Sequence, residues 1–314
     1  MVARHSRILD RALTRLKLRQ LRLLVAVGRN GNIQNAAREL GISQPAATKM
    51  IQDLELDFEV RLFERTNRGV IPTVFGETLI RHGKLIFAQV SNAAQELDDL
   101  SEGSSGRVVI GTLLAASAKL LPTAIEMLLQ ERPKVAIKVT EGTNEVIMPA
   151  LHSGEIDMVV GRLSTHRYRA RIVQEKLFDD RVVAVVGKNH SVAGKTNVSF
   201  EELKPYGWIL PPLETTLRRQ ADQFFVSEHE YAPSVALESV SYLTNRSLIQ
   251  SRDLVGLMPS HVVSQDIENG YLALVDWAVP FGDGPVGVSY RIGDSLSPAG
   301  AAFLKALRRA AIVL

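Results

Sequence analysis

The sequence predicts a winged helix-turn-helix at the N-terminus, joined by a long linker helix to a two-part α/β region. Three observations support this prediction. Two helical patterns flank a glycine-containing turn within residues 32–58, apolar residues repeat in heptads over 79–100, and strand-like runs alternate with helical ones from 107 onwards. A chain of 314 residues is about twice the length of an ordinary domain, which agrees with two or three globular units.

Amino-acid composition limits the possible classes of protein. There is no cysteine, which excludes disulfides, thiolate zinc sites and cysteine nucleophiles and makes the cytoplasm the expected compartment. No apolar run approaches the ~20 residues of a membrane span, and residues 1–16 lack the apolar core of a signal peptide, so no membrane contact is expected. The 7 histidines have no metal-binding spacing, no GxSxG or Walker motif occurs, and no GxGxxG follows a predicted strand. We therefore expect no metal, no cofactor and no enzyme activity.

Charge is distributed unevenly along the chain. Residues 1–73 contain 13 Lys and Arg against 7 Asp and Glu, a net charge of +6, whereas the remainder contains 24 against 27, a net charge of −3. A basic head on a slightly acidic body is typical of a nucleic-acid-binding end joined to a different module. The alternative is a charge run that only solvates a surface, and the motif within the basic region disfavours it.

The first helices support the motif. Residues 1–16 form a basic segment to which the pattern assigns no role, and leucines and valines between 18 and 27 then supply the apolar face of a first helix. A shorter helix is predicted over 32–40. Gly41 can take positive φ and end that helix, which leads through a tight turn into the next one.

The helix predicted over 43–58 has two opposed faces, and the remainder of the chain makes sense as the means of placing it. Ala47, Ile51 and Leu54 lie on a core-facing stripe. Ser43 is a good N-cap and Pro45 suits the first turn, so the helix presents free N–H groups that favour phosphate. The other face carries residue types that hydrogen-bond base edges, as expected of a helix that enters the major groove.

Residues 60–73 predict a wing. Two short β-prone pieces flank the turn 67–69, which has basic residues at its tip. The residues expected to contact DNA are therefore Gln34, Ser43, Gln44, Pro45, Thr48, Lys49, Gln52, Arg65, Arg68 and Thr73.

A long helix is predicted from Thr73, a good N-cap, to about residue 100. Its apolar residues are spaced 4, 3, 4, 3, 4, 3, which is a coiled-coil seam and implies a partner helix. The alternative is a helix that lies on its own domain, and Gly83 either allows close approach or marks a bend. The residues expected in the seam of a dimer are Leu79, Ile86, Val90, Ala93, Leu97 and Leu100.

Residues 101–106 are a short polar linker, so domain boundaries are expected after residues 73 and 106. The alternation beyond them predicts mostly parallel sheet covered on both faces, with a ligand in the crevice where strand ends and helix N-termini converge. Each expected ligand residue could instead be only an N-cap or a solvated charge. If Arg162 and Arg218 face the crevice, an anionic ligand such as a sugar acid or aromatic carboxylate is favoured. The expected residues are Ser117, Thr143, Arg162, Thr215, Thr216, Arg218 and Ser239.

The sequence contains, in this order, Ala36-Ala37, Leu40, Ser43-Gln44-Pro45-Ala46, Thr48-Lys49, Ile51, Leu54-Glu55, Leu62-Phe63-Glu64-Arg65, Arg68-Gly69 and Thr73-Val74-Phe75-Gly76, followed by looser matches at 141–142, 151–157, 255–259, 296–299 and Phe303. This ordered set resembles the LysR-type transcriptional regulators, a family of bacterial winged helix-turn-helix proteins. Two residues depart from the family pattern: Glu59 stands where a helix-ending glycine is usual, and Phe58 where leucine is usual, which suggests a differently set helix end.

The resemblance implies a fold and a function. The α/β region would have two lobes like those of periplasmic solute-binding proteins, lobe I at about 107–166 and 275–314 and lobe II at about 167–274. The protein would regulate bacterial metabolic or uptake genes under a small-molecule effector bound between the lobes, with some resemblance to the branch governing sugar uptake and aromatic-acid breakdown. A dimer or tetramer would bind an interrupted palindrome in double-stranded DNA, with RNA polymerase as a further candidate partner.

Two other classes remain open at this point. One is an enzyme or transport-type binding protein that carries the N-terminal unit as an appendage. The other is an architectural DNA-binding protein whose C-terminal region only oligomerises, and an effector-induced melting shift would argue against it.

Overall fold

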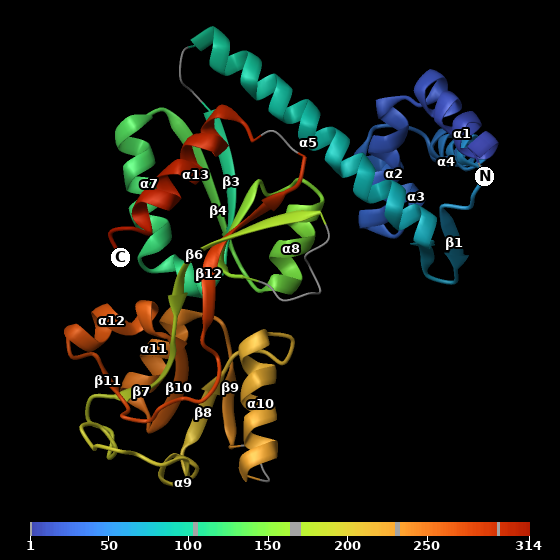
Figure 1. Cartoon of the computed structure of the whole chain (residues 1–314). Helices are drawn as coiled ribbons and strands as arrows, with labels where there is room; N and C mark the ends of the chain where they lie inside the picture. Colours follow the sequence, from blue (N-terminus) through green and yellow to red (C-terminus); the bar gives the residue numbers. More distant parts are fainter. Residues whose placement is uncertain (1, 103–105, 164–170, 230–232, 294–295) are drawn as a thin grey trace. The chain divides into compact units, whose positions relative to one another are not determined.

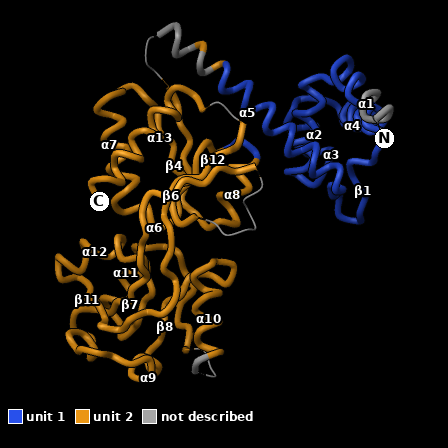
Figure 2. Tube along the Cα trace, viewed as in Figure 1, with its two compact units in different colours: residues 1–93, 153–155 blue, residues 94–152, 156–314 orange. Residues whose placement is uncertain are grey.

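The computed structural model describes residues 2–102, 106–163, 171–229, 233–293 and 296–314, whose helices and strands are labelled in Figure 1. The chain divides into two compact units, one of residues 1–93 with 153–155 and the other of residues 94–152 with 156–314 (Figure 2). None of the helices in these ranges is long and apolar enough to cross a membrane.

The first unit is a winged helix-turn-helix with an additional helix at its start. Its elements are α1 (Val2–Arg15), α2 (Leu18–Asn30), α3 (Ile33–Glu39), α4 (Gln44–Phe58), β1 (Phe63–Thr66), β2 (Gly69–Pro72) and the first part of α5 (Val74–Glu102). Leu24 of α2, Ala36 of α3 and Leu54 of α4 are fully buried in one apolar core. Strands β1 and β2 pair antiparallel, with Arg65 opposite Val70, and form the predicted wing.

The helix-turn-helix is held by capping residues, of which the sequence indicated Gly41 and Ser43 but not Asn32. Asn32 Oδ1 accepts a hydrogen bond from the N–H of Gln34 at 2.8 Å, at the start of α3. Gly41 has φ 65° in the turn, and Ser43 Oγ accepts from the N–H of Ala46 at 3.4 Å at the start of α4. These short polar side chains satisfy N–H groups that have no partner within their own helices.

The C-terminal end of α4 corrects one expectation. Glu59 adopts the left-handed conformation that glycine would take there, with φ 55° and ψ 35°, so the helix end is not set differently. Arg11 of α1 binds the Glu59 carboxylate, with 2.9 Å between Nη1 and Oε1. An ion pair from the additional helix therefore accompanies a backbone conformation that is unfavourable for a residue with a side chain.

The long helix α5 supports both interpretations of its apolar seam, in different parts. Leu79 packs against the core of the first unit, and a Cβ atom at Gly83 would lie 3.3 Å from Val25 Cγ2, so this glycine lets α5 approach α2 of its own domain. Ile86 and Leu97 are 38% and 67% exposed. The coiled-coil interpretation therefore stays a prediction for the later part of the helix, where Ile86, Val90, Ala93 and Leu97 are exposed. Of those seam residues, the side chain of Leu100 lies outside the part of the chain that the structure describes.

The second unit contains two five-stranded sheets. The sheet of lobe I has the order β4-β3-β5-β12-β6, with strands β3 (Gly106–Thr112), β4 (Val135–Glu141), β5 (Met158–Arg162), β6 (Ile172–Asp180) and β12 (Gly284–Arg291). The sheet of lobe II has the order β11-β7-β10-β8-β9, with strands β7 (Val182–Gly187), β8 (Gly207–Leu210), β9 (Val235–Glu238), β10 (Leu254–Pro259) and β11 (Leu272–Leu274). Strands β3, β4 and β5 run parallel, as do β8, β9 and β10, whereas β12, β6, β7 and β11 pair antiparallel.

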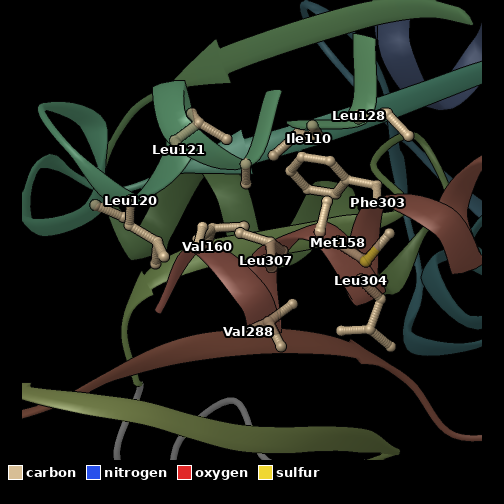
Figure 3. Close-up of a cluster of buried hydrophobic side chains, with 14 of the residues drawn as sticks. Ile110, Leu120, Leu121, Leu128, Met158, Val160, Val288, Phe303, Leu304 and Leu307 are labelled. Atoms are coloured by element: carbon tan, nitrogen blue, oxygen red, sulfur yellow. The ribbon is translucent and has the colours of Figure 1, made fainter. Parts of the chain in front are cut away.

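Helices supply the apolar layers against these sheets. Lobe I carries α6 (Leu114–Ser117), α7 (Leu120–Glu131), α8 (Asn144–His152) and α13 (Pro298–Ala310), and lobe II carries α9 (Phe200–Leu203), α10 (Thr216–His229), α11 (Tyr242–Ser251) and α12 (Ser260–Glu268). Figure 3 shows the lobe I core, where Phe303 and Leu307 of α13 meet Ile110 of β3. Trp208 and Phe225 are fully buried in the lobe II core.

The expected boundaries between the lobes were wrong. Strand β6 pairs with β12 in the sheet of lobe I, so the chain first crosses at 180–182 and not at about 167. Val275 and Phe281 pack in the core of lobe II, so the return crossing lies just before Gly284 and not at 275. The crossings are made by the ends of two long antiparallel strands, and a strand-like pattern does not show to which sheet a strand belongs.

Candidate DNA-binding surface and effector cavity

Helix α4 has the two faces that its sequence predicted. Ala47 and Leu54 are fully buried, whereas Gln44, Lys49 and Gln52 are exposed on the opposite side. Pro45 is also exposed in the first turn, where a missing N–H breaks no helical hydrogen bond. The outward face therefore offers amide and ammonium groups at the start of a helix whose positive dipole end favours phosphate.

Two other predicted residues flank this face. Gln34 is exposed in the first turn of α3, and its backbone N–H donates to Asn32 Oδ1. Thr48 lies on α4 with its Oγ1 shielded from solvent, and no group in the described ranges hydrogen-bonds that oxygen. A Thr48 contact with DNA through oxygen therefore requires rotation of χ1.

The wing presents its two arginines to solvent and is fixed by its own backbone. Arg65 on β1 and Arg68 at the turn are both exposed. The N–H of Val70 donates to the carbonyl oxygen of Gly31 at 2.8 Å, which ties β2 to the end of α2. A Cβ atom at Gly69 would lie 2.2 Å from that same oxygen, so this position, with φ 141°, requires glycine. The sequence motif contained Gly69, but only the packing explains it.

Of the two roles expected of Thr73, the structure supports the N-cap of α5 and not a contact with DNA. Its hydroxyl donates to the carbonyl oxygen of Arg61 at 2.7 Å and accepts from the N–H of Gly76 at 3.1 Å. The Thr73 N–H donates to the carbonyl oxygen of Leu62 at 2.9 Å. Thr73 therefore caps the start of α5. Because its hydroxyl and its N–H both donate to carbonyl oxygens, it has no hydrogen to offer a phosphate.

A cavity of about 140 Å³ lies within the second unit, with walls from both lobes. Its size is comparable to that of a ~150 Å³ cavity that holds benzene. Leu113 and Leu163 of lobe I and Ile209, Val240 and Met258 of lobe II give it apolar walls. Five of the seven expected ligand residues line it, namely Thr143, Arg162, Thr215, Thr216 and Ser239.

Two of the expected ligand residues, Ser117 and Arg218, do not line this cavity, so the prediction was wrong for them. The hydroxyl of Ser117 donates to the carbonyl oxygen of Leu114 at 2.9 Å. Arg218 is 7% exposed, and its guanidinium binds Asp222 through Nε at 2.9 Å and Glu238 through Nη1 at 2.6 Å. Burial lowers the pKa of Arg218, but its hydrogen bonds to the two carboxylates outweigh this and raise the pKa above its ordinary value. This cation is neutralised within lobe II and is not free for a ligand.

Arg162 has the opposite environment. It ends β5, and its Nη1 and Nη2 are shielded from solvent without a hydrogen-bond partner in the described ranges. Burial lowers the pKa of Arg162 from its ordinary value, and the charges of Asp180 and Asp283 oppose this only in part. A guanidinium remains charged at neutral pH even so, and the cavity therefore contains a cation with unused donors.

Three polar residues and one glycine in the cavity wall were not predicted from the sequence. They are Glu141, Gly142, Asn144 and Asn245. Asn144 Oδ1 and Asn245 Oδ1 are both shielded without a hydrogen-bond partner among the described groups. Asn144 directly follows the predicted Thr143, so the start of α8 could have indicated it, whereas Asn245 lies inside α11 and only the packing brings it to the cavity. The structure contains no cluster of three or more possible metal ligands within its described ranges.

These features define a class of protein: a winged helix-turn-helix DNA-binding protein with a separate two-lobed ligand-binding module. Comparisons of the sequence identify the family. Residues 18–77 match the model "Bacterial regulatory helix-turn-helix protein, lysR family", and residues 101–312 match the model "LysR substrate binding domain". The chain belongs to the LysR family of bacterial transcriptional regulators, DNA-binding proteins that carry an effector-binding domain.

Individual relatives agree with this assignment over nearly the whole chain. The chain is 32% identical to the HTH-type transcriptional regulator GbpR of Azospirillum brasilense, over 94% of this chain and 87% of that protein. It is 29% identical to the HTH-type transcriptional regulator PcaQ of Agrobacterium fabrum, over 95% of this chain and 96% of that protein. The crystal structure of full-length CbnR with its target DNA has the same fold, with a TM-score of 0.64 at 21% identity, over 94% of this chain and 100% of that chain.

Proposed function

We propose that this regulator responds to a small anionic effector bound by Arg162 in the cavity between the lobes. The observation that carries the proposal is the Arg162 guanidinium, which is enclosed and has two nitrogens without partners in the described ranges. Enclosing a cation without a hydrogen-bonding partner is unfavourable, and an anionic ligand would supply that partner. The genes controlled would then be those of the metabolism or uptake of such an acid.

The DNA-binding part of the proposal assigns roles on the first unit. Gln44, Lys49 and Gln52 read base edges or position α4 in the major groove, and Arg65 and Arg68 bind phosphates through the wing. GbpR and PcaQ are transcriptional regulators by name, and CbnR was crystallised with its target DNA. Because a bacterial regulator acts on the chromosome, the cytoplasm is its proposed location.

Self-association completes the proposed assembly. Ile86, Val90, Ala93 and Leu97 follow one another along α5 at heptad spacing and would pack against a second copy as a dimer or tetramer. Two-fold symmetry then requires an interrupted palindrome as the target. RNA polymerase is a further proposed partner of the DNA-bound assembly.

The test of the effector site is calorimetric titration of the full-length protein with small monocarboxylates and, separately, with neutral sugars. Replacing Arg162 with glutamine should weaken acid binding by roughly 10–150-fold, the equivalent of losing a hydrogen bond to a charged group. Arg252→Gln is the matched control, because Arg252 is an exposed arginine of lobe II that does not line the cavity. Equal acid binding by wild type and Arg162→Gln would disprove the assignment.

A further inference from the structure

The unpartnered polar atoms of the cavity are of two opposite kinds. Arg162 contributes only donors, from Nη1 and Nη2. Asn144 and Asn245 contribute acceptors, since the Oδ1 of each is shielded and has no partner among the described groups. All three residues line the same cavity. A ligand that satisfies this wall must therefore accept hydrogen bonds at one point and donate them at another.

The amide orientation of Asn245 is fixed by a hydrogen bond. Its Nδ2 donates to the carbonyl oxygen of Ser239 at 3.4 Å, and a carbonyl oxygen can only accept. Reversing the amide would place Oδ1 against that oxygen, so Oδ1 is the atom left without a partner among the described groups. Because Asn245 is 4% exposed, bulk water does not satisfy it. The unused acceptor is therefore set by the packing of α11.

The ionisable side chains of the wall limit the charge of the ligand. The wall residues include one cation, Arg162, and one carboxylate, Glu141. A guanidinium fork matches a planar carboxylate with two parallel hydrogen bonds. A dianionic phosphate carries two negative charges, and the wall has only one cation to balance them. The positive N-terminal ends of α8 and α10, at Asn144 and Thr216, favour an anion as well. The wall is suited to a monoanion.

Gly284 of strand β12 lies close to the Arg162 guanidinium. A Cβ atom at Gly284 would lie 3.0 Å from Arg162 Nη1, which is closer than an ordinary contact. An alanine at Gly284 would therefore require the guanidinium to move by a few tenths of an ångström. This gives a second way to disturb the anion site without changing the charge of Arg162.

From these constraints we infer that the effector is a compact hydroxylated monocarboxylic acid, whose carboxylate binds Arg162 and whose hydroxyl donates to Asn245. The inference rests on the proposed function and adds the second pole of the ligand. The apolar walls and the volume of about 140 Å³ limit the body joining the two poles to about one six-membered ring or a chain of similar size. Asn144 and Glu141 accept from further hydroxyl groups where the ligand has them.

The test compares ligands that differ by one hydroxyl group. Full-length protein is titrated calorimetrically with benzoate and its three monohydroxy isomers, with cyclohexanecarboxylate and its hydroxylated counterparts, and with phenol and glucose as neutral compounds. At least one hydroxy acid of a pair should bind roughly tenfold or more tightly than its parent acid, because the parent leaves the Asn245 acceptor unsatisfied. A phosphate monoester of similar size should bind more weakly than the acid.

Three variants separate the two poles. Asn245→Ala should abolish the preference for the hydroxy acid while the parent acid still binds. Because the preference is a ratio within one variant, partial unfolding of that variant cancels. Arg162→Gln and Gly284→Ala should weaken both acids of a pair together and leave their ratio unchanged.

The outcomes distinguish this inference from the proposed function. If the acids bind through Arg162 but a hydroxyl adds nothing, or if Asn245→Ala keeps the preference, the hydroxy-acid inference is overturned and the anion site stands. If no acid binds at millimolar concentration, or if acids bind equally to wild type and Arg162→Gln, the proposed anion site itself fails. Tighter binding of the phosphate monoester or of glucose would also overturn the inference.

Discussion

The ion pair between Arg11 and Glu59 gives a prediction about the end of the recognition helix. The family model for the helix-turn-helix matches from residue 18, so α1 lies outside it, yet α1 supplies the arginine that binds Glu59. Glycine takes the left-handed conformation without a side-chain penalty. We therefore expect Arg11→Ala to destabilise the end of α4 less in a Glu59→Gly protein than in the wild type. The perturbation is a double-mutant cycle of Arg11→Ala and Glu59→Gly.

The expected magnitudes follow from the geometry. A left-handed non-glycine residue costs on the order of 1 kcal/mol, which Glu59→Gly recovers. The Arg11 and Glu59 side chains are 32% and 29% exposed, so their ion pair contributes only ~0.2–1 kcal/mol. Glu59→Gly should therefore range from neutral to about 1 kcal/mol stabilising. Arg11→Ala should destabilise the wild type by up to ~1 kcal/mol but the Glu59→Gly protein by about 0.5 kcal/mol less.

Amide hydrogen exchange is the appropriate assay, because it reports the opening of this helix end in the full-length protein. The N–H of Val60 donates to the carbonyl oxygen of Glu55 at 3.1 Å. Arg11→Ala should accelerate exchange of this N–H, and the acceleration should be about twofold larger in the wild type than in the Glu59→Gly protein. The reasoning is refuted if Glu59→Gly destabilises the helix end by more than about 1 kcal/mol, or if Arg11→Ala has the same effect in both backgrounds.

Three further predictions concern other surfaces. Gln44→Ala should reduce affinity for the specific site by ~1–3 kcal/mol with little effect on other DNA, whereas Arg68→Ala should weaken all DNA and lower the salt slope by about 1; equal losses on both kinds of DNA by Gln44→Ala would contradict this. Leu97→Asp should dissociate the oligomer in light scattering, and an unchanged mass would exclude Leu97 from the seam. Arg308 lowers the pKa of Glu175 through two hydrogen bonds of 2.8 Å, so the stability that this pair gives is present above the ordinary Glu pKa and is lost as pH falls through the lowered value. Glu175→Gln should reduce the loss of unfolding free energy at acidic pH by less than ~1 kcal/mol, measured by melting at a series of pH values. An unchanged pH dependence would show that this ion pair does not contribute to stability.

The sequence predicted the first unit well because its information is local. Side chains three and four residues apart share a helix face, so the spacing alone assigns Ala47 and Leu54 to the core and Gln44 and Lys49 to solvent. Gly83 could not be assigned in this way, because the heptad spacing of α5 is the same whether the partner helix is a second copy or α2 of the same chain. Its close contact with Val25 decides that point.

The effector cavity was less predictable because its residues are brought together by tertiary structure. Helix N-termini indicated Thr143 and Thr215, since a strand end followed by a helix start is visible in the sequence. Arg218 failed on the same reasoning: Asp222 lies four residues later and is an expected helix partner, but Glu238 reaches it only through the packing of lobe II. A cation in the first turn of a helix therefore does not show that its charge is available to a ligand.

The contrast between Arg162 and Arg218 leads to a final prediction, on the stability of the ligand-free protein. Arg218 has carboxylate partners within hydrogen-bonding distance, whereas the terminal nitrogens of Arg162 have none in the described ranges and burial lowers its pKa. For a base, a lowered pKa means that the charged form is less favourable in the folded than in the unfolded chain, so at neutral pH this arginine opposes folding. Arg162→Gln should then leave the ligand-free protein as stable as the wild type or more stable, by on the order of 1 kcal/mol, although it loses the ligand.

Arg218→Gln is the matched comparison, and it should be destabilising because it leaves the Asp222 and Glu238 carboxylates without their cation. Differential scanning calorimetry of both variants with and without the tightest-binding acid would check the prediction. Saturating acid, at about 100 times its Kd, should stabilise the wild type by about 2.7 kcal/mol and Arg162→Gln by much less. A large loss of ligand-free stability in Arg162→Gln would show that its guanidinium has partners within the fold, and the argument for a ligand-binding cation would then fail.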